Sequence, residues 1–214
     1  MNIALIPLGG MGANCYVLSS GNEAAVVDPG EDCEALRSFA ATTKLDIKYI
    51  LLTHGHFDHI GGAAFMKDAL RDAKVCIGKE DAGMLLSSTA SLGAMFGYDH
   101  PPVSADITLA EGDELTLGGE TIRVMHTPGH TPGGVIYLVG DMALCGDTVF
   151  MGSIGRCDFP GSDIRQMAAS LERVKALPPD TRLFPGHGEP TSVQRELKFN
   201  PYLGRNYDTL FDQQ

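Results

Sequence analysis

The most constraining feature of the chain is a run of six residues, His54-Gly55-His56-Phe57-Asp58-His59, which directly follows the apolar segment Tyr49–Leu52. The apolar segment predicts a buried strand, so the run lies where that strand ends. Side chains alternate in direction at a strand end, so the first two histidines can face one ion while the aspartate and the third histidine face a neighbouring one. Three imidazoles and a carboxylate at this density favour a metal site over a chance cluster of surface histidines.

Three further donors stand in similar settings later in the chain. His130 lies in a Pro-Gly-His turn after an apolar strand, Asp147 in a Gly-Asp-Thr turn after another, and His187 in a Pro-Gly-His-Gly turn after a third. Glycine borders each donor at the point where a predicted strand ends. One rim of a layered fold could therefore gather all of the donors.

The two remaining histidines and the cysteines are interpreted as structural. His126 is expected to support the site without binding metal, and His100, beside two prolines, is expected in a surface loop. Cys145 precedes the turn that holds Asp147, but strand alternation directs its side chain into the core. The five cysteines lack CxxC spacing and are odd in number, which argues against a disulfide framework and fits a reducing compartment.

Hydrophobic spacing predicts a mixture of strands and helices, which is typical of a layered α/β architecture. Residues 1–214 are expected to form one domain. Residues 88–105 have no clear period and predict a long loop with some helix. This loop could cover a site and pack Met95, Phe96 and Tyr98 on an acyl group; the alternative is an ordinary surface loop. The expected strands are 15–18, 24–27, 49–52, 75–77, 114–117, 122–125, 135–139, 143–144 and 183–184, and the expected helices lie near 32–43, 65–70, 79–87, 163–174 and 191–199.

Composition and charge exclude several classes of function. The net charge is −11 and no basic cluster interrupts it, so nucleic acid is not an expected partner. Residues 1–10 contain neither a basic region nor a long apolar run, and no stretch reaches the roughly 18 apolar residues of a membrane span. We therefore expect a soluble, cytoplasmic protein without membrane association.

The complete donor pattern resembles that of the metallo-β-lactamase superfamily, in which an HxHxDH loop is followed by a separate His, Asp and His. The resemblance implies a four-layer αββα sandwich with a metal site at one edge between the two sheets. It also implies that two metal ions share seven ligands. His54, His56 and His130 would bind the first ion, Asp58, His59 and His187 the second, and Asp147 both.

Two adjacent metal ions would make a shared hydroxide available near neutral pH, and Asp58 and Asp147 would hold and orient it. Zn²⁺ is the first expectation for the metal, with iron and manganese as alternatives, because imidazole and carboxylate suit all three. A thiolate leaving group needs little protonation whereas an amine needs a proton donor. The predicted chemistry is therefore hydrolysis of a small-molecule thioester.

Residues 150–156 with 158–161, and residues 185–188 with 200–202, are similar to the small bacterial type II glyoxalases, which hydrolyse hydroxyacylglutathione thioesters. This resemblance implies that Arg156 binds a carboxylate of glutathione; the alternative is a structural ion pair with Asp158. The longer glyoxalases II carry a C-terminal helical domain that supplies basic residues for the glutathione moiety, and this chain of 214 residues is expected to lack it. Those enzymes also use a tyrosine in the loop after the bridging aspartate, where this sequence has Asp158. The alternatives to a thioesterase are a persulfide dioxygenase with one iron, a lactonase, and a non-catalytic metal-binding protein.

Overall fold

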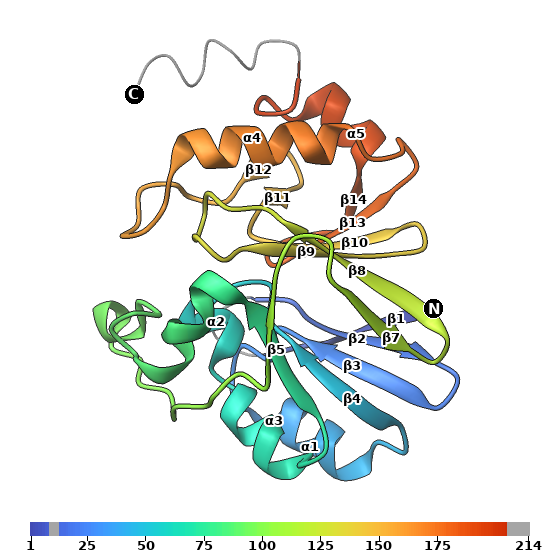
Figure 1. The fold of residues 1–214 in the computed structure, drawn as a ribbon, viewed down its shortest axis with the longest axis vertical. Helices are drawn as coiled ribbons and strands as arrows, with labels where there is room; N and C mark the ends of the chain where they lie inside the picture. The colour runs from blue at the N-terminus through green and yellow to red at the C-terminus, as the bar shows by residue number, and fades with distance from the viewer. Residues whose placement is uncertain (9–12, 205–214) are drawn as a thin grey trace.

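Two β-sheets lie face to face in the computed structural model, which describes residues 1–8 and 13–204, and helices cover the outer face of each sheet (Figure 1). This is the αββα arrangement expected from the resemblance. Several strands extend beyond the predicted ranges by one to three residues. None of the helices in the described part of the chain is long and apolar enough to cross a bilayer.

The first sheet has the strand order β1-β2-β3-β4-β5-β6 in the described chain. Strands β1 to β3 pair antiparallel, and β3 to β6 pair parallel. Helices α1 (Glu34–Thr42) and α3 (Ala63–Ala69) cover its outer face. The strands are β1 (Asn2–Ile6), β2 (Cys15–Ser20), β3 (Glu23–Val27), β4 (Asp46–Leu51), β5 (Lys74–Gly78) and β6 (Ile107–Leu109).

The second sheet has the order β14-β13-β10-β9-β8-β7. Strands β10 and β13 pair parallel, and the other strand pairs in the described part of this sheet are antiparallel. Helices α4 (Ile164–Lys175) and α5 (Val193–Phe199) cover its outer face. The strands are β7 (Glu114–Leu117), β8 (Glu120–His126), β9 (Val135–Val139), β10 (Met142–Gly146), β13 (Arg182–Pro185) and β14 (Thr191–Ser192), and β11 (Val149–Phe150) with β12 (Ser153–Ile154) forms a separate hairpin.

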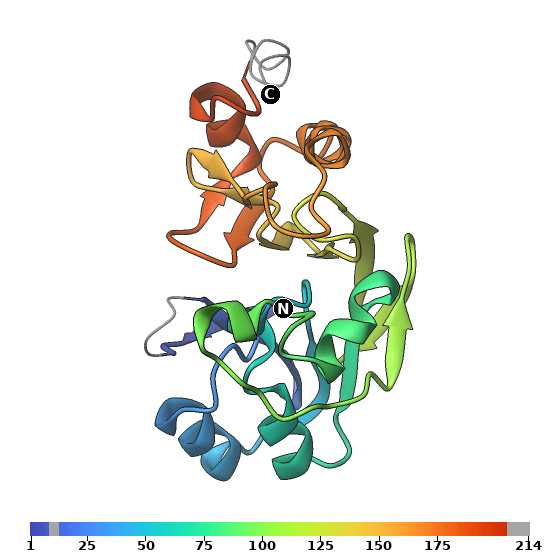
Figure 2. The same ribbon diagram turned by 90° about the vertical axis from the view of Figure 1, so that its left-hand side faces the viewer.

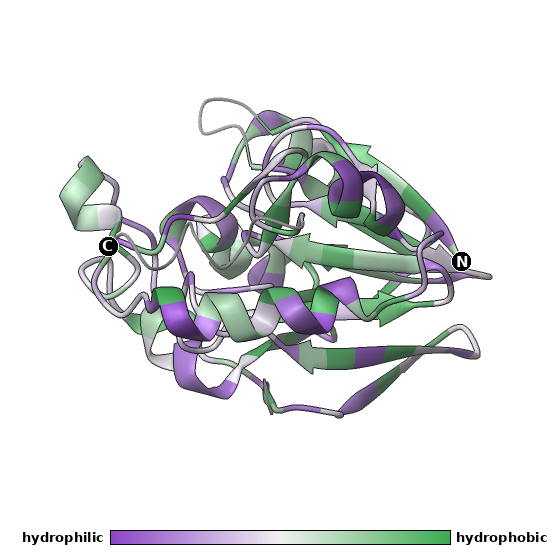
Figure 3. Cartoon of the chain, turned by 90° about the horizontal axis from the view of Figure 1, so that it is seen from above, coloured by the Kyte–Doolittle hydropathy of each residue, from purple (hydrophilic) through white to green (hydrophobic). Residues whose placement is uncertain are grey.

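Three layers of buried side chains hold the sandwich together. The central layer joins the two sheets, with Leu51 from the first meeting Tyr137 and Leu144 from the second. The other two layers lie between each sheet and its helices. Figure 3 looks down on the α4 side and shows hydrophilic and hydrophobic residues interleaved along the helices there, as expected for helices with one face on the core.

Helix α4 shows how local sequence places these layers. The Asp163 side chain accepts hydrogen bonds from the backbone N–H groups of Arg165 and Gln166, so it caps the helix. Met167 and Leu171 then lie one helical turn apart on the buried face. Burial of each such side chain stabilises the fold by roughly 1.5–3 kcal/mol.

The segment between β5 and β6 differs from its prediction in detail. Residues Lys79–Leu86 form a 3₁₀ helix, η1, rather than an α-helix, and a second 3₁₀ helix, η2, covers Gly93–Phe96 within the expected loop. Both lie with α2 (Phe57–Ile60) at one edge of the sandwich, which Figure 2 views directly. This edge is where the HxHxDH segment emerges from β4.

Close backbone packing positions the start of α2. A Cβ on Gly30 would lie 1.8 Å from the Asp58 carbonyl oxygen. A side chain at Gly83 in η1, by contrast, would meet no heavy atom within 4 Å. The turn after β3 therefore tolerates no side chain at Gly30.

We predict that Gly30→Ala lowers the free energy of unfolding of the metal-free protein by roughly 1–3 kcal/mol, because the new methyl group displaces the start of α2. The control, Gly83→Ala, should leave it unchanged or raise it by up to about 1 kcal/mol. Denaturant unfolding measures both. Equal stability of the two variants would show that the turn can relax.

Candidate metal centre

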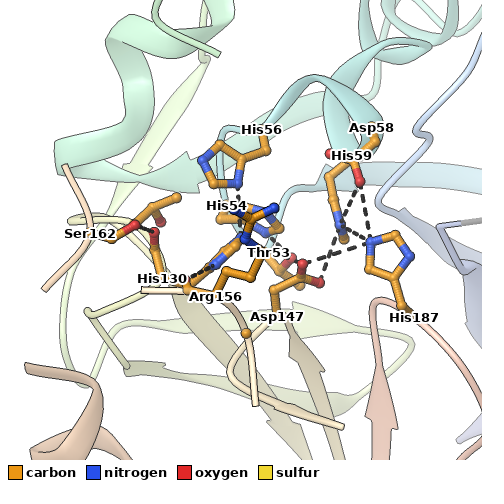
Figure 4. Close-up of polar contacts among 12 residues, drawn as sticks. Thr53, His54, His56, Asp58, His59, His130, Asp147, Arg156, Ser162 and His187 are labelled. Carbon is orange, nitrogen blue, oxygen red and sulfur yellow. Dashed lines mark hydrogen bonds and ion pairs between the residues drawn. The ribbon is translucent and has the colours of Figure 1, made fainter. Parts of the chain in front are cut away.

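All seven predicted donors meet at the edge of the sandwich between the two sheets (Figure 4). The segment after β4 supplies four of them, two from the loop and two from α2. The other three follow strands β8, β10 and β13 of the second sheet. The donors are His54, His56, Asp58, His59, His130, Asp147 and His187.

One group of three donors consists of His54, His56 and His130, and their ligand atoms lie within 4.8 Å of one another. His56 Nδ1 and His130 Nε2 are 2.8 Å apart. The rings of His54 and His56 lie edge to face, with centroids 4.9 Å apart. Three imidazole nitrogens from two sheets therefore converge on one point.

A second group consists of Asp58, His59 and His187. His187 Nε2 lies 3.2 Å from Asp58 Oδ2 and 3.3 Å from His59 Nε2. Asp147 lies between the groups: its Oδ2 is 3.4 Å from His130 Nε2 and 3.7 Å from His187 Nε2. Its carboxylate is thus close to donors of both groups.

Three histidines are oriented through their Nδ1 atoms. His130 Nδ1 contacts the Arg156 carbonyl at 2.7 Å, which requires a proton on Nδ1 and leaves the Nε2 lone pair for the site. His59 Nδ1 lies 3.0 Å from Asp28 Oδ2, and His54 Nδ1 lies 3.2 Å from Thr53 Oγ1. Each contact is of the kind that fixes the tautomer of a metal-binding histidine.

The donor set fits a cation better than it fits hydrogen bonds among its own members. Among the described residues, His54 Nε2 and Asp147 Oδ1 are the buried side-chain atoms without a hydrogen-bond partner. Asp147 Oδ1 does lie 3.3 Å from His59 Nε2, but without hydrogen-bond geometry. Buried polar atoms without partners are costly, and a metal ion would satisfy both.

The electrostatics of His54, His56 and Asp147 suit a cation. Burial lowers the pKa of His54 well below its ordinary value, and burial together with His130 lowers the pKa of His56 to about 3. Burial acts to raise the pKa of Asp147, but the adjacent His59 holds that pKa well below its usual range. Near neutral pH the two imidazoles are therefore neutral and the carboxylate is ionised, as metal ligands must be.

A pocket of about 190 Å³ opens on the donors. His56, Asp58, His130 and Asp147 border one side of it. Phe57, Leu92, Phe96 and Phe159 border the other. The pocket therefore joins a polar floor to an apolar wall.

Sequence reasoning missed the role of Asp81, a fully buried carboxylate in η1. Its oxygens accept hydrogen bonds from the Gly55 N–H (3.0 Å), the Thr131 hydroxyl (2.7 Å) and the Gly133 N–H (2.7 Å). Burial raises its pKa, while these hydrogen bonds act against the rise. Gly55 separates His54 from His56, and Thr131 follows His130, so one carboxylate ties the donor loops of both sheets together.

Asp28 has a comparable role within the first sheet. It accepts from the Thr53 N–H and hydroxyl, both at 2.7 Å, and contacts His59. Its φ of 50° is a left-handed conformation, unusual for a residue other than glycine. The Asp-Pro-Gly sequence signals a turn here, but nothing local indicates the distant partners of Asp28 or Asp81.

The remaining predicted residues lie around this centre. His126 Nε2 contacts the Pro132 carbonyl at 2.9 Å, and His100 Nε2 contacts Ser91 Oγ at 2.9 Å, so both have structural partners. Cys145 is fully buried, as expected. Arg156 forms a bidentate ion pair with Asp158, in which Nε and Nη2 donate to the two carboxylate oxygens at 2.9 and 2.8 Å. A role for Arg156 in substrate binding stays a prediction.

We predict that Asp81→Asn weakens metal binding by roughly 10–100-fold, because an amide cannot accept all three hydrogen bonds and the donor loops separate. Chelator competition measures the affinity, and the absorption spectrum of the cobalt-loaded protein reports ligand geometry. Asp180→Asn is the control, since that exposed carboxylate precedes β13, at the opposite end of the strand from His187. An unchanged affinity and spectrum in Asp81→Asn would refute a positioning role, whatever happens to stability.

Comparison with known proteins agrees with this arrangement. The sequence pattern described as the metallo-beta-lactamase superfamily matches residues 8–187. A Haemophilus influenzae protein named "Hydroxyacylglutathione hydrolase GloC" is 34% identical, over 95% of this chain and 98% of its own length.

Two solved structures are also similar. The BLEG-1 B3 metallo-beta-lactamase has a TM-score of 0.88 at 35% identity, covering 94% of this chain and 99% of its own. The protein TTHA1623, solved in a di-iron-bound form, has a TM-score of 0.83 at 38% identity, covering 94% of this chain and 100% of its own. In fold, sequence pattern and clustered His and Asp donors, this chain belongs to the metallo-beta-lactamase superfamily.

Proposed function

We propose that the protein is a binuclear metal-dependent thioester hydrolase of the hydroxyacylglutathione hydrolase type. One observation carries the proposal: two three-donor groups lie side by side, with the Asp147 carboxylate between them. The similarity to a relative named as a hydroxyacylglutathione hydrolase supports the choice of substrate.

His54, His56 and His130 would hold one ion, Asp58, His59 and His187 the other, and Asp147 both. Bound there, the ions would act as Lewis acids toward the substrate carbonyl and make a water nucleophilic near neutral pH. Zn²⁺ is the metal we propose. Iron and manganese are the alternatives, and the di-iron form of a related protein supports keeping iron among them.

The pocket lining favours a thioester over an amide. Among its described lining residues, every titratable side chain belongs to the donor set, and the others are apolar. No separate acid is therefore available there to protonate a leaving group. A thiolate leaves readily without a proton, because a thiol has a pKa near 8.5, whereas an amine leaving group requires general-acid catalysis.

Arg156 is the proposed contact for a carboxylate of the thiol moiety. Its guanidinium lies 4.2 Å from the centre of the Phe159 ring, which borders the pocket. The ion pair with Asp158 is largely exposed, with side chains 63% and 66% accessible. Exposed pairs contribute little to stability, so the guanidinium can exchange Asp158 for a substrate carboxylate.

The first test concerns stoichiometry. Two donor groups predict about two metal ions per chain in metal-replete protein, measured by elemental analysis, and loss of hydrolytic activity when a chelator removes them. Recovery of activity on adding Zn²⁺ would support zinc. A single tightly bound iron per chain would favour the persulfide dioxygenase alternative instead.

The second test concerns catalysis. Metal-replete protein should hydrolyse S-lactoylglutathione, and Asp147→Ala should lower kcat at least about 100-fold because the carboxylate shared by both ions is lost. Asp180→Ala, which removes an exposed carboxylate, should retain normal kcat. Failure of the wild-type protein to hydrolyse any acyl thioester would reject the proposed function. Near-normal kcat in a metal-replete Asp147→Ala protein would reject the bridging role alone.

A further inference from the structure

The pocket above the donors has an apolar side whose residues come from three distant segments. Phe57 begins α2, Leu92 and Phe96 flank and end η2, and Phe159 follows β12. We call these four side chains, three phenylalanines and Leu92, the aromatic wall. Their convergence on one face of the metal centre requires an explanation beyond metal binding, because none of them can be a ligand.

Ring contacts make the wall continuous. Phe57 and Phe96 stack with centroids 5.3 Å apart, and Phe96 meets Phe159 edge to face at 6.5 Å. Phe159 in turn meets the ring of His56 at 5.7 Å. Tyr98 packs on Phe57 at 5.3 Å. The wall thus begins directly at the first donor group and extends away from it.

The segment that carries Leu92 and Phe96 is held under local strain. Leu92 has a φ of 67°, which is rare for a side chain of this size, yet it is almost fully buried. The Phe57 N–H donates to the Ser91 carbonyl at 3.0 Å, which fastens the segment to α2. Strained backbone that the surrounding contacts maintain is characteristic of binding sites.

Phe96 is 50% exposed although it lies within this packed group. Part of its surface borders the pocket, so a ligand there would cover apolar surface that water now contacts. The four wall side chains carry no polar atom. A hydroxyl on the bound group would therefore find no side-chain partner in the wall, whereas a hydrocarbon would gain from burial.

We propose that the aromatic wall binds the acyl group, so that the enzyme hydrolyses glutathione thioesters of apolar acyl chains faster than the lactoyl thioester that tests the reaction itself. This inference rests on the proposed thioester hydrolysis and specifies its substrate class. With the scissile carbonyl at the donors, the wall is the adjoining surface of the pocket. The thiol moiety would lie at the Phe159 end of the wall, where the Arg156 guanidinium packs on that ring.

The kinetic test uses glutathione thioesters that share one thiol and differ only in the acyl group: acetyl, propionyl, butyryl, hexanoyl and lactoyl. We expect kcat/KM to rise about fourfold with each added methylene until the pocket is filled, the factor that corresponds to about 0.8 kcal/mol per CH₂. The lactoyl thioester should be a poorer substrate than the butyryl thioester. A flat series, or a preference for lactoyl, would overturn the inference while leaving the thioesterase proposal intact.

Two variants locate the effect. Phe96→Ala should flatten the chain-length dependence with unchanged metal content, because it removes the half-exposed ring from the wall. Met95→Ala is the matched control: it is the neighbouring apolar residue, 64% exposed and outside the pocket lining. It should keep the wild-type dependence. An unaltered slope in Phe96→Ala, or equal loss in both variants, would contradict the assignment.

A binding measurement keeps the inference testable without catalysis. Titration calorimetry of metal-loaded protein with acetate, butyrate and hexanoate should show affinity increasing with chain length, and Phe96→Ala should reduce that increase. Equal affinity for all three carboxylates would overturn the wall assignment. If no thioester is hydrolysed but the chain-length dependence of binding is present, the proposed function fails and the apolar site stands.

Discussion

The packing of the two sheets against each other is the interaction on which the candidate centre depends. Side chains of both sheets form the central core, the Tyr137 hydroxyl donates to the Leu52 carbonyl at 2.8 Å, and the Val135 N–H donates to the Thr53 carbonyl at 2.8 Å. Each of the two donor groups takes two members from the segment after β4 and one from the second sheet, and Asp147 also comes from the second sheet. Neither sheet holds a complete group, so separation of the sheets would abolish all of them together.

Two buried carboxylates control how closely the donors approach. Asp28 acts within the first sheet, through Thr53 and His59, whereas Asp81 connects the first sheet to the loop that carries His130. Burying a carboxylate is unfavourable, as the raised pKa of Asp81 indicates, and three hydrogen bonds offset that cost. Through these hydrogen bonds Asp81 holds the loops that carry His54, His56 and His130 close together.

The pocket has the donors on one side and the aromatic wall on the other, and the two sides suit different parts of a substrate. The donor side is suited to activating water and polarising a carbonyl, and the wall is suited to holding a hydrocarbon group in place. Arg156 lies at the border, over Phe159 and paired with Asp158. The ion pair that sequence reasoning set against substrate binding is present, and its exposure makes the two roles compatible.

The candidate donors and the strands that precede them could be predicted from the sequence. Glycine-bounded turns at the ends of apolar strands are local signals, so the strand before His54 and the capped helix after Asp163 were predictable from neighbouring residues. The resemblance to a known family then supplied the layered architecture. That resemblance also implied how the donors are grouped. The tertiary structure was needed to show that Asp81 links two donor loops and that Phe57, Leu92, Phe96 and Phe159 form one wall. The partners of Asp81 are up to 52 positions away in the chain, and they are mostly backbone N–H groups that every residue but proline possesses. Such contacts leave no trace in the local pattern, because their specificity comes from the approach of two sheets rather than from residue type.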